Sequence, residues 1–281
     1  MKLLVLLLTL VTSCEAAIAQ TTVKANRLRE ESLHSSALGR EMKYRVLVPQ
    51  AYGGSLQRYP VLYLLHGLTG DYKDWTTRTN IAEYTRALAL IVVMPDGENQ
   101  WYTNAADGSA RFEDYITTDL PADVVSKYRT VNSRYGRAIA GLSMGGYGAL
   151  KIALKRPAQF AAVGSFSGAF GVTMEGQYDR MIASAKAPSL VQIFGPADSE
   201  TRKQNDLLLL APALKTAGAP YIYIDCGTSD TLITENREVV AKIHATGAAY
   251  EYHEVAGAHT WDYWDRRIRE FLPLLMKRLA N

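Results

Sequence analysis

Short apolar runs alternate with longer amphipathic segments along most of the chain. Residues 61–65 and 88–94 are continuous apolar runs, the pattern of parallel strands that are covered on both faces. Residues 43–48 alternate between polar and apolar positions, as a strand with one solvent-exposed face does. Four further runs complete the set of predicted strands, at 137–140, 160–163, 221–225 and 250–255.

Helical patterns lie between these runs. The predicted helices span residues 80–87, 112–128, 145–156, 234–246 and 262–279. Repeated alternation of strand and helix predicts an α/β fold, in which a mostly parallel central sheet carries helices on both faces. Residues 171–215 break this alternation, and we expect them to form a small insertion over one end of the sheet. Residues 20–281 as a whole are expected to form a single domain.

The first 19 residues differ in pattern from the rest of the chain. Lys2 precedes an apolar run, residues 3–11, which is much shorter than the roughly 20 residues needed to span a bilayer. A charged start, a short apolar run and small residues ending in an A-x-A sequence predict a signal peptide over residues 1–19. The protein is therefore expected to be exported, to the periplasm or the exterior. The sequence VTSC, which ends at Cys14, also resembles a bacterial lipoprotein box, so a lipid anchor at this cysteine stays open.

Composition and charge exclude several classes of protein. The length of 281 residues and the 48% content of hydrophobic residues exclude a disordered chain or a disulfide-stapled miniprotein. The formal net charge of +3 is small and the chain has no run of Lys or Arg, so we expect no nucleic-acid partner. If Cys14 leaves with the signal peptide, Cys226 has no cysteine to pair with, and we expect a buried structural thiol there.

The strongest chemical signal is the sequence GLSMG, residues 141–145, between a predicted strand and a predicted helix. This context is typical of a nucleophile elbow, a tight turn that lifts a serine hydroxyl clear of the sheet. Gly141 and Gly145 fit this turn because side chains there would collide with neighbouring elements. Ser143 is therefore the candidate nucleophile. The amide of Met144, at the positive end of the following helix, is a candidate donor to an oxyanion.

A serine hydroxyl needs a base within hydrogen-bond reach, and that base needs an orienting acid. His259 is the candidate base because it lies in a turn between the last predicted strand and the last predicted helix. Asp230, in the loop after strand 221–225, is the favoured acid, and Asp225 is the alternative. The order Ser, Asp, His is that of an α/β-hydrolase. The other four histidines are expected to pack, to lie on the surface or to brace a loop, namely His34, His66, His244 and His253.

A second oxyanion donor is expected after strand 61–65, where the sequence reads His66-Gly67-Leu68. Gly67 allows the backbone to approach a substrate closely, and the amide of Leu68 is the best candidate donor. His66 is expected to brace this loop by hydrogen bonds. This chemistry requires no metal and no organic cofactor.

Aromatic residues gather near the predicted ends of strands. In α/β folds ligands bind outside the carboxyl ends of the strands, and an aromatic lining suits an aryl acyl group or a sugar face. Trp75, Trp101 and Trp261 are the candidate substrate-binding residues. Trp264 shares a helical face with apolar residues of the last helix and is expected in the core. Tyr102 and the turn at 96–97 are further candidates for the site.

Five stretches carry a resemblance to a known family. They are LLHGLTGDYKDW (64–75), VVMPDGENQWY (92–102), AIAGLSMGGYGALKIALKRPAQFAAVGSFSGA (138–169), DCGTSD (225–230) and GAHTWDYWDRRIREFLPLL (257–275). The chain resembles the esterase D / putative esterase family of α/β-hydrolases, which includes S-formylglutathione hydrolases, tributyrin-type and feruloyl esterases, and mycolyl-transferases. The resemblance implies the α/β-hydrolase fold, the Ser143–Asp230–His259 triad, and an oxyanion hole made by the amides of Leu68 and Met144.

The expected function is that of a secreted serine esterase acting on carboxylic esters of small molecules or carbohydrates, with a short-chain, acetyl or feruloyl acyl group. An acyltransferase of the mycolyl-transferase type uses the same triad and is the main alternative. A catalytically silent binding domain is disfavoured because all three triad residues are present, and a peptidase because the chain has no room for a propeller domain. The loop LTGDYKDW lacks the cysteine associated with S-formylglutathione hydrolases, which argues with the signal peptide against formaldehyde detoxification.

Overall fold

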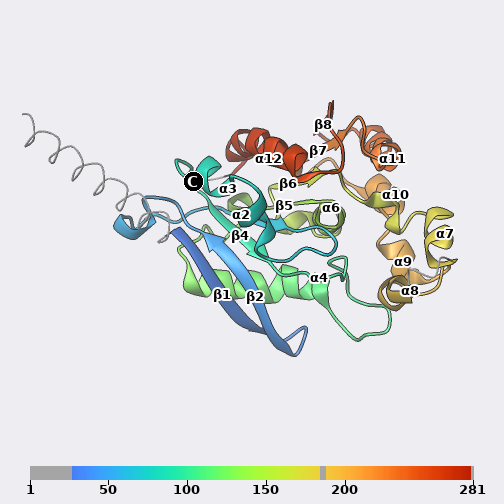
Figure 1. The fold of residues 1–281 in the computed structure, drawn as a ribbon, viewed down its shortest axis with the longest axis horizontal. Helices are drawn as coiled ribbons and strands as arrows, with labels where there is room; N and C mark the ends of the chain where they lie inside the picture. The colour runs from blue at the N-terminus through green and yellow to red at the C-terminus, as the bar shows by residue number, and fades with distance from the viewer. Residues whose placement is uncertain (1–26, 184–187, 280–281) are drawn as a thin grey trace, which may run out of the picture.

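The computed structural model describes residues 27–183 and 188–279 (Figure 1). The predicted signal peptide and the candidate lipid anchor at Cys14 lie outside these residues. Within the two described ranges, every helix is too short or too polar to cross a membrane.

Eight strands form one sheet in the order β1-β2-β4-β3-β5-β6-β7-β8. β1 and β2 are antiparallel to each other, β2 is antiparallel to β4, and the strands from β4 to β8 are parallel to their neighbours. The strands are β1 (Leu28–Ser35), β2 (Arg40–Leu47), β3 (Val61–Leu65), β4 (Ile91–Pro95), β5 (Arg137–Leu142), β6 (Ala162–Phe166), β7 (Tyr221–Gly227) and β8 (Tyr250–Val255). The mostly parallel sheet predicted from the sequence is confirmed.

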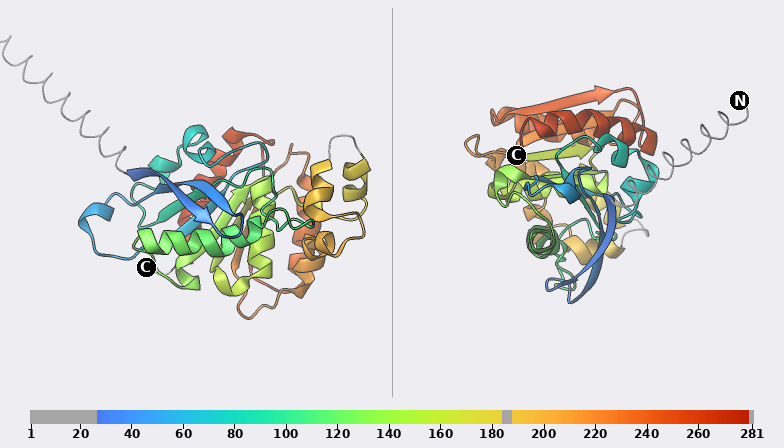
Figure 2. Two further views of the ribbon diagram at one scale, coloured as in Figure 1. Left: turned by 90° about the horizontal axis from the view of Figure 1, so that it is seen from below. Right: turned by 90° about the vertical axis from the view of Figure 1, so that its left-hand side faces the viewer.

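Helices cover both faces of this sheet because the central strands bury apolar side chains on each side. Alternate residues of β3 enter two separate hydrophobic clusters. One cluster contains residues of α5 (Leu120–Lys127), α6 (Met144–Lys155) and α11 (Ile233–Ala245). The other contains residues of α3 (Ile81–Tyr84) and α12 (Trp261–Met276). The sheet is therefore the middle layer of three (Figures 1 and 2).

The predicted insertion contains four short helices at one end of the molecule, far from β1 and β2 (Figure 2). They are α7 (Gln177–Ala183), α8 (Pro188–Phe194), α9 (Glu200–Gln204) and α10 (Leu207–Leu210). Phe194 of α8 packs against the rings of Trp101 and Tyr147, so the insertion contacts the loop after β4 and the start of α6.

Two elements, β1 and α2, could not be predicted from the hydrophobic pattern. β1 is an edge strand whose only buried side chains are those of Leu33 and Ser35, so it lacks the apolar face that marks a strand in sequence. α2 (Asp74–Arg78) is a single short helix with one buried residue, Trp75. The predicted helix 112–128 is also interrupted, since a π-helical turn separates α4 (Phe112–Asp114) from α5.

Candidate active site

Ser143 lies at the junction of β5 and α6 with φ 51° and ψ −118°, a conformation that few residues other than glycine adopt. Its amide donates to the carbonyl oxygen of Phe166 at 2.9 Å, which ties the turn to β6. A Cβ at Gly141 would lie 2.5 Å from the carbonyl carbon of Gly145, and a Cβ at Gly145 would lie 2.6 Å from the oxygen of Leu65. The close approaches predicted for both glycines are therefore present.

Three side chains predicted from the sequence meet at this turn. The Nε2 atom of His259 lies 3.0 Å from the Oγ of Ser143, and its Nδ1 lies 2.9 Å from Oδ2 of Asp230. The side chain of Asp230 is buried, whereas that of His259 is 34% exposed. The imidazole therefore bridges an accessible hydroxyl and a buried carboxylate.

Two loops are fastened together to bring Asp230 and His259 into contact. β7 and β8 are parallel neighbours, and the loop after β7 donates one hydrogen bond to the end of β8 and one to the loop that follows β8. The amide of Thr228 donates to the carbonyl oxygen of Val255 at 3.0 Å, and the amide of Ser229 donates to the carbonyl oxygen of Gly257 at 2.9 Å. A Cβ at Gly227 would overlap the carbonyl oxygen of Gly257, so this contact requires glycine there.

The environment of Asp230 favours its charged form. Burial by itself raises the pKa of this carboxyl group, but the hydrogen bond with His259 and the amide of Leu232 outweigh it and leave the pKa below its ordinary value. The carboxylate can therefore hold the Nδ1–H of His259 and stabilise a positive charge on the ring.

Asp225, the alternative acid, is engaged elsewhere. Its buried carboxylate accepts from the hydroxyl of Tyr263 at 3.0 Å and from Nε of Arg267 at 3.1 Å. Both donors belong to α12, so Asp225 fastens this helix to β7 and does not orient His259.

The loop after β3 lies against the nucleophile. A Cβ at Gly67 would lie 3.5 Å from the Cβ of Ser143 and 2.6 Å from the side chain of Leu142. Among the described residues, the amides of Leu68 and Met144 have no hydrogen-bond acceptor, so both are available to an oxyanion. His66 is buried and contacts the carbonyl oxygen of Gly67 through Nδ1 at 2.7 Å, which agrees with the bracing role expected for it.

A cleft of about 430 Å³ opens beside the hydroxyl of Ser143. It is lined by Gly67, Leu68, Thr69, Gly70, Asp74, Arg78, Leu142, Ser143, His259, Trp261 and Trp264. Within residues 27–183 and 188–279, no cluster of three or more His, Cys, Asp or Glu side chains could hold a metal ion.

Of the three tryptophans that were candidates for substrate binding, one lines the cleft and two do not. Trp261 lines the cleft, as expected. Trp75 does not line it, because its ring turns into the core, is 1% exposed and donates to the oxygen of Leu65 at 3.0 Å. Trp101 does not line it either, because Phe194 of the insertion covers its ring. The expectation that Trp75 and Trp101 contact substrate directly is therefore not met by this geometry.

Several residues that line the cleft could not be predicted from the sequence, among them Trp264, Asp74 and Arg78. Trp264 belongs to a core cluster, as expected, but its ring also borders the cleft, with its centroid 4.8 Å from that of His259. Trp264 follows Trp261 by three residues, so both rings lie on one face of the helix. This spacing is the sequence feature that could have placed Trp264 beside the cleft. Asp74 and Arg78 form an ion pair at 3.2 Å in α2, a helix that the hydrophobic pattern did not predict.

The remaining titratable candidates lie away from the cleft. Cys226 is buried, and burial raises the pKa of its thiol to about 12, so it is a structural thiol as predicted. Tyr102 and the turn at 96–97 support His66 from below the loop and do not line the cleft. The other histidines have partners of their own, Glu41 for His34, Tyr250 for His244 and Glu251 for His253.

Comparison with known proteins gives relatives over nearly the whole described chain. The family model described as putative esterase matches residues 35–275. The chain is 31% identical over 211 residues to an acetyl esterase of Caldicellulosiruptor saccharolyticus, which covers 74% of this chain and 79% of that protein. It is 28% identical over 278 residues to the diacylglycerol acyltransferase/mycolyltransferase Ag85B of Mycobacterium leprae, which covers 87% of this chain and 82% of that protein.

A solved structure gives the same architecture. The fluorophosphonate-binding serine hydrolase FphF of Staphylococcus aureus superposes with a TM-score of 0.78 at 25% identity, covering 89% of this chain and 98% of that one. The α/β-hydrolase fold expected from the sequence is confirmed by this similarity and by the order of the strands.

Proposed function

The chain belongs to the putative esterase family of α/β-hydrolases and is a carboxylic ester hydrolase, and from that premise we propose that it acts through a triad of Ser143, His259 and Asp230. The observation that carries this proposal is the bridging position of His259, whose two ring nitrogens lie 3.0 Å and 2.9 Å from the hydroxyl and the carboxylate. These are hydrogen-bond distances for a nucleophile, a base and an orienting acid.

In the proposed mechanism, the Oγ of Ser143 attacks the ester carbonyl carbon while Nε2 of His259 takes its proton. The amides of Leu68 and Met144 donate to the oxyanion that forms. The alcohol leaves with the proton from His259, and an acyl-enzyme remains. Water then attacks the acyl carbon by the same route, and the carboxylic acid leaves Ser143 free again.

The replacement Ser143→Ala tests the proposed nucleophile. We expect turnover of p-nitrophenyl acetate to be lost while the thermal unfolding midpoint stays close to that of the unmodified protein. Ser165→Ala is the matched control, because this buried serine has no hydrogen-bond partner for its hydroxyl among the described residues. Full activity in the Ser143 variant would remove the assignment.

The cleft favours small, uncharged acyl esters whose alcohol or acyl group presents a flat apolar face. Trp261 and Trp264 supply aromatic surface. Among the described residues that line the cleft, Arg78 and Asp74 are the only charged pair besides the triad, and they neutralise each other. We propose acetylated or feruloylated carbohydrates and short-chain esters as substrates. An ester panel tests this: we expect acetyl and feruloyl esters to be hydrolysed and octanoyl esters to be poor substrates.

Acyl transfer is the second candidate, and the similarity to the mycobacterial acyltransferase over 87% of the chain favours it. A sugar or alcohol would then replace water in attacking the acyl-enzyme. Product analysis with excess trehalose or glycerol discriminates between the two reactions. Acylated acceptor as the main product would favour transfer, and free acid alone would favour hydrolysis.

We further propose that residues 1–19 are a signal peptide and that residues 20–281 form the mature, exported domain. Mass spectrometry of the purified protein from fractionated cells tests this. A mature chain beginning at residue 20 supports a cleaved signal. A chain beginning with an acylated Cys14 supports the lipoprotein alternative, and an intact N-terminus in the cytoplasmic fraction contradicts both.

A further inference from the structure

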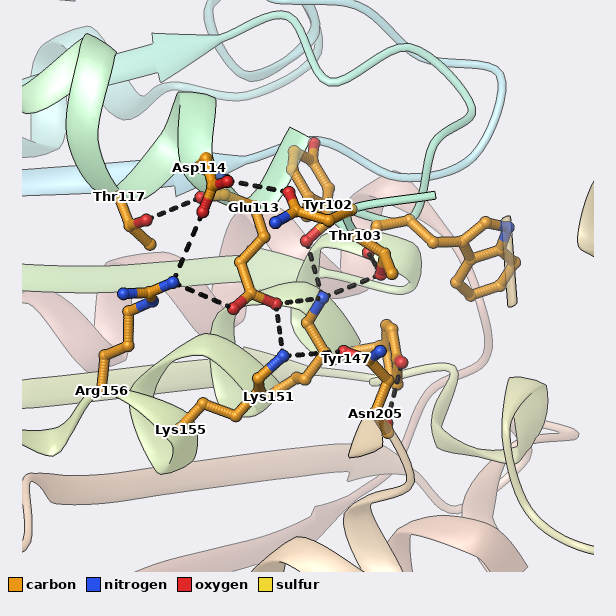
Figure 3. A network of polar contacts seen from close by, with 12 residues as sticks. Tyr102, Thr103, Glu113, Asp114, Thr117, Tyr147, Lys151, Lys155, Arg156 and Asn205 are labelled. Carbon is orange, nitrogen blue, oxygen red and sulfur yellow. Dashed lines mark hydrogen bonds and ion pairs between the residues drawn. The ribbon is translucent and has the colours of Figure 1, made fainter. Parts of the chain in front are cut away.

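A fully buried lysine lies in the middle of α6, the helix that begins directly after Ser143. The ammonium of Lys151 donates to the carbonyl oxygen of Tyr102 at 2.7 Å and to the hydroxyl of Thr103 at 2.8 Å, and it pairs with Glu113 at 3.2 Å (Figure 3). All three of its donors therefore have partners, which a buried charge requires. Lys151 does not line the cleft, so the proposed reaction makes no direct use of it.

The backbone that Lys151 holds has an unfavourable conformation. Trp101 and Tyr102 are consecutive residues with φ of 53° and 52°, in the left-handed region. Such a conformation persists where surrounding contacts over-determine it. The ammonium on the Tyr102 carbonyl is one such contact. A second is the packing of the Tyr102 ring between Gly97 and Gly148, where an added Cβ would overlap the ring or lie 2.6 Å from it.

The side chain of Tyr102 reaches the loop after β3. Its hydroxyl donates to the carbonyl oxygen of His66 at 3.0 Å. The Nε2 atom of His66 accepts from the amide of Gly97 at 2.8 Å, and because a backbone amide only donates, the proton of a neutral ring lies on Nδ1. That Nδ1–H donates to the carbonyl oxygen of Gly67 at 2.7 Å.

The hydrogen bond from His66 to the carbonyl oxygen of Gly67 also orients the amide of Leu68. The carbonyl of Gly67 and the amide of Leu68 belong to the same planar, trans peptide unit and point in opposite directions. The Gly67 oxygen is held by His66 and by the amide of Gly70 at 3.1 Å. Fixing this oxygen therefore fixes the direction of the Leu68 N–H in the loop that lies against Ser143.

We propose that Lys151 and Tyr102 are positioning residues that tie α6 to the loop carrying Leu68. One proposed oxyanion donor, the Met144 amide, begins α6, and the other lies on a loop that α6 contacts through Lys151, Tyr102 and His66. The connection keeps the two donors at a fixed spacing, which is what stabilisation of a transient oxyanion demands. This inference rests on the proposed serine esterase mechanism.

The replacement Tyr102→Phe removes only the hydroxyl that contacts His66. The matched control is Tyr147→Phe, because Tyr147 is equally buried and its hydroxyl also donates to a backbone oxygen, that of Asn205 at 2.9 Å. With p-nitrophenyl acetate, we expect Tyr102→Phe to lower kcat about tenfold at unchanged KM, less than the 10²–10³-fold cost of losing a donor outright. We expect Tyr147→Phe to leave both constants unchanged.

Inhibition by phenylboronic acid separates positioning from general destabilisation. Boronate forms a tetrahedral, anionic adduct with the nucleophile and so reports on the oxyanion donors. We expect its inhibition constant to rise by the same factor as kcat falls in Tyr102→Phe, and to stay unchanged in Tyr147→Phe. Thermal unfolding of both variants is measured in parallel.

A pair of lysine variants tests the contacts that Lys151 makes with Tyr102 and Thr103. Lys151 and Lys155 both pair with Glu113, at 3.2 Å and 2.9 Å, but only Lys151 contacts Tyr102 and Thr103. Lys151→Met should lose kcat and boronate affinity as well as stability, whereas Lys155→Met should lose stability alone. If Lys151→Met does not fold, Tyr102→Phe decides the question.

The possible failures are distinguishable. If the unmodified protein is active and Tyr102→Phe equals Tyr147→Phe in kcat and in boronate affinity, the positioning proposal is wrong and the esterase proposal stands. If the unmodified protein hydrolyses no ester of the panel, the proposed function fails, and this inference fails with it.

Discussion

At the scale of single residues, two carboxylates that lie only five positions apart have different partners, His259 in one case and α12 in the other. Asp230 lies in a loop, is buried, and holds the Nδ1 of His259 at 2.9 Å. Asp225 is still within β7 and is held by Arg267 and Tyr263 of α12. The difference follows from geometry, because a side chain inside a strand points to one face of the sheet, here toward α12, whereas a loop beyond the end of the strand can reach His259.

Exchanging each carboxylate for an amide tests this assignment. Asp230→Asn should lower kcat by about 10³–10⁴-fold, because the amide stabilises the wrong imidazole tautomer and carries no charge. Asp225→Asn should leave kcat within a few-fold and lower the free energy of unfolding by about 3 kcal/mol, because Arg267 loses a buried partner. Activity assays and urea unfolding check the pair, and the reverse pattern would make Asp225 the acid.

Trp261 provides a residue-scale test of the substrate proposal. Loss of its ring in Trp261→Ala removes aromatic stacking of roughly 1 kcal/mol, so KM for feruloyl or acetylated sugar esters should rise about fivefold. Kinetics with ethyl acetate should change little, because neither its acyl group nor its alcohol group presents a flat face. Trp261→Phe is the control and should restore most of the affinity. Equal effects on both substrate types would argue against a stacking role.

The residues of the proposed triad could be selected from the sequence, whereas the walls of the cleft could not. Ser143 has a local motif, and His259 stands at the end of a strand pattern, so each has a signal in the chain itself. Trp75 and Trp101 are as aromatic as Trp261, yet one ring turns inward under β3 and the other lies beneath Phe194. Side-chain direction at these positions depends on tertiary packing, which periodicity does not encode.

At the scale of elements, the site depends on contacts between loops that follow neighbouring strands. The loops after β7 and β8 approach so closely that Gly227 has no room for a side chain beside Gly257. β7 could be predicted from its apolar run, and β8 from the alternation of aromatic or apolar residues with polar ones. β1 and α2 could not, because an edge strand and a five-residue helix bury too few side chains to give a period.

Widening the gap between these two loops should impair catalysis more than folding. In Gly227→Ala the new Cβ would push the loop of His259 away from Asp230, and we expect kcat to fall at least about tenfold, since small misplacements of catalytic groups are costly. Gly53→Ala is the control, because a Cβ there would meet no atom within 4 Å. Steady-state kinetics and thermal unfolding of both variants check this. Unchanged kcat in a folded Gly227→Ala protein would contradict it.

At the scale of the whole molecule, one buried carboxylate connects three parts of the chain. Glu113 of α4 pairs with Lys151 and Lys155 of α6, and Lys155 also donates to Asn205 in the insertion at 3.2 Å (Figure 3). The existence of the insertion could be predicted from the break in alternation at 171–215. Its attachment could not, because buried polar pairs between distant segments leave no mark in the hydrophobic pattern.

The charge of Glu113 makes stability depend on acidity in a predictable direction. Burial by itself raises the pKa of Glu113, but Lys151 and Lys155 outweigh it and lower the pKa to about 2. The folded protein therefore keeps this carboxylate charged down to a lower pH than the unfolded chain does. The resulting stability is fully present above the unfolded value near 4.5, and it is lost as pH falls from there to about 2.

Urea unfolding at pH 6, 4, 3 and 2 measures this contribution, which the shift places at roughly 3 kcal/mol. Glu113→Gln should be less stable than the unmodified protein by about that amount at pH 6, and most of the gap should be gone at pH 2, where about half of the carboxyl groups in the folded protein are protonated. Asp230, whose pKa is also lowered, remains in both proteins and cancels in the comparison. Glu200→Gln, at a side chain 76% exposed, should show no gap at any pH. A gap that stays constant from pH 6 to pH 2 would mean that Glu113 contributes packing rather than charge, and that the insertion is attached without it.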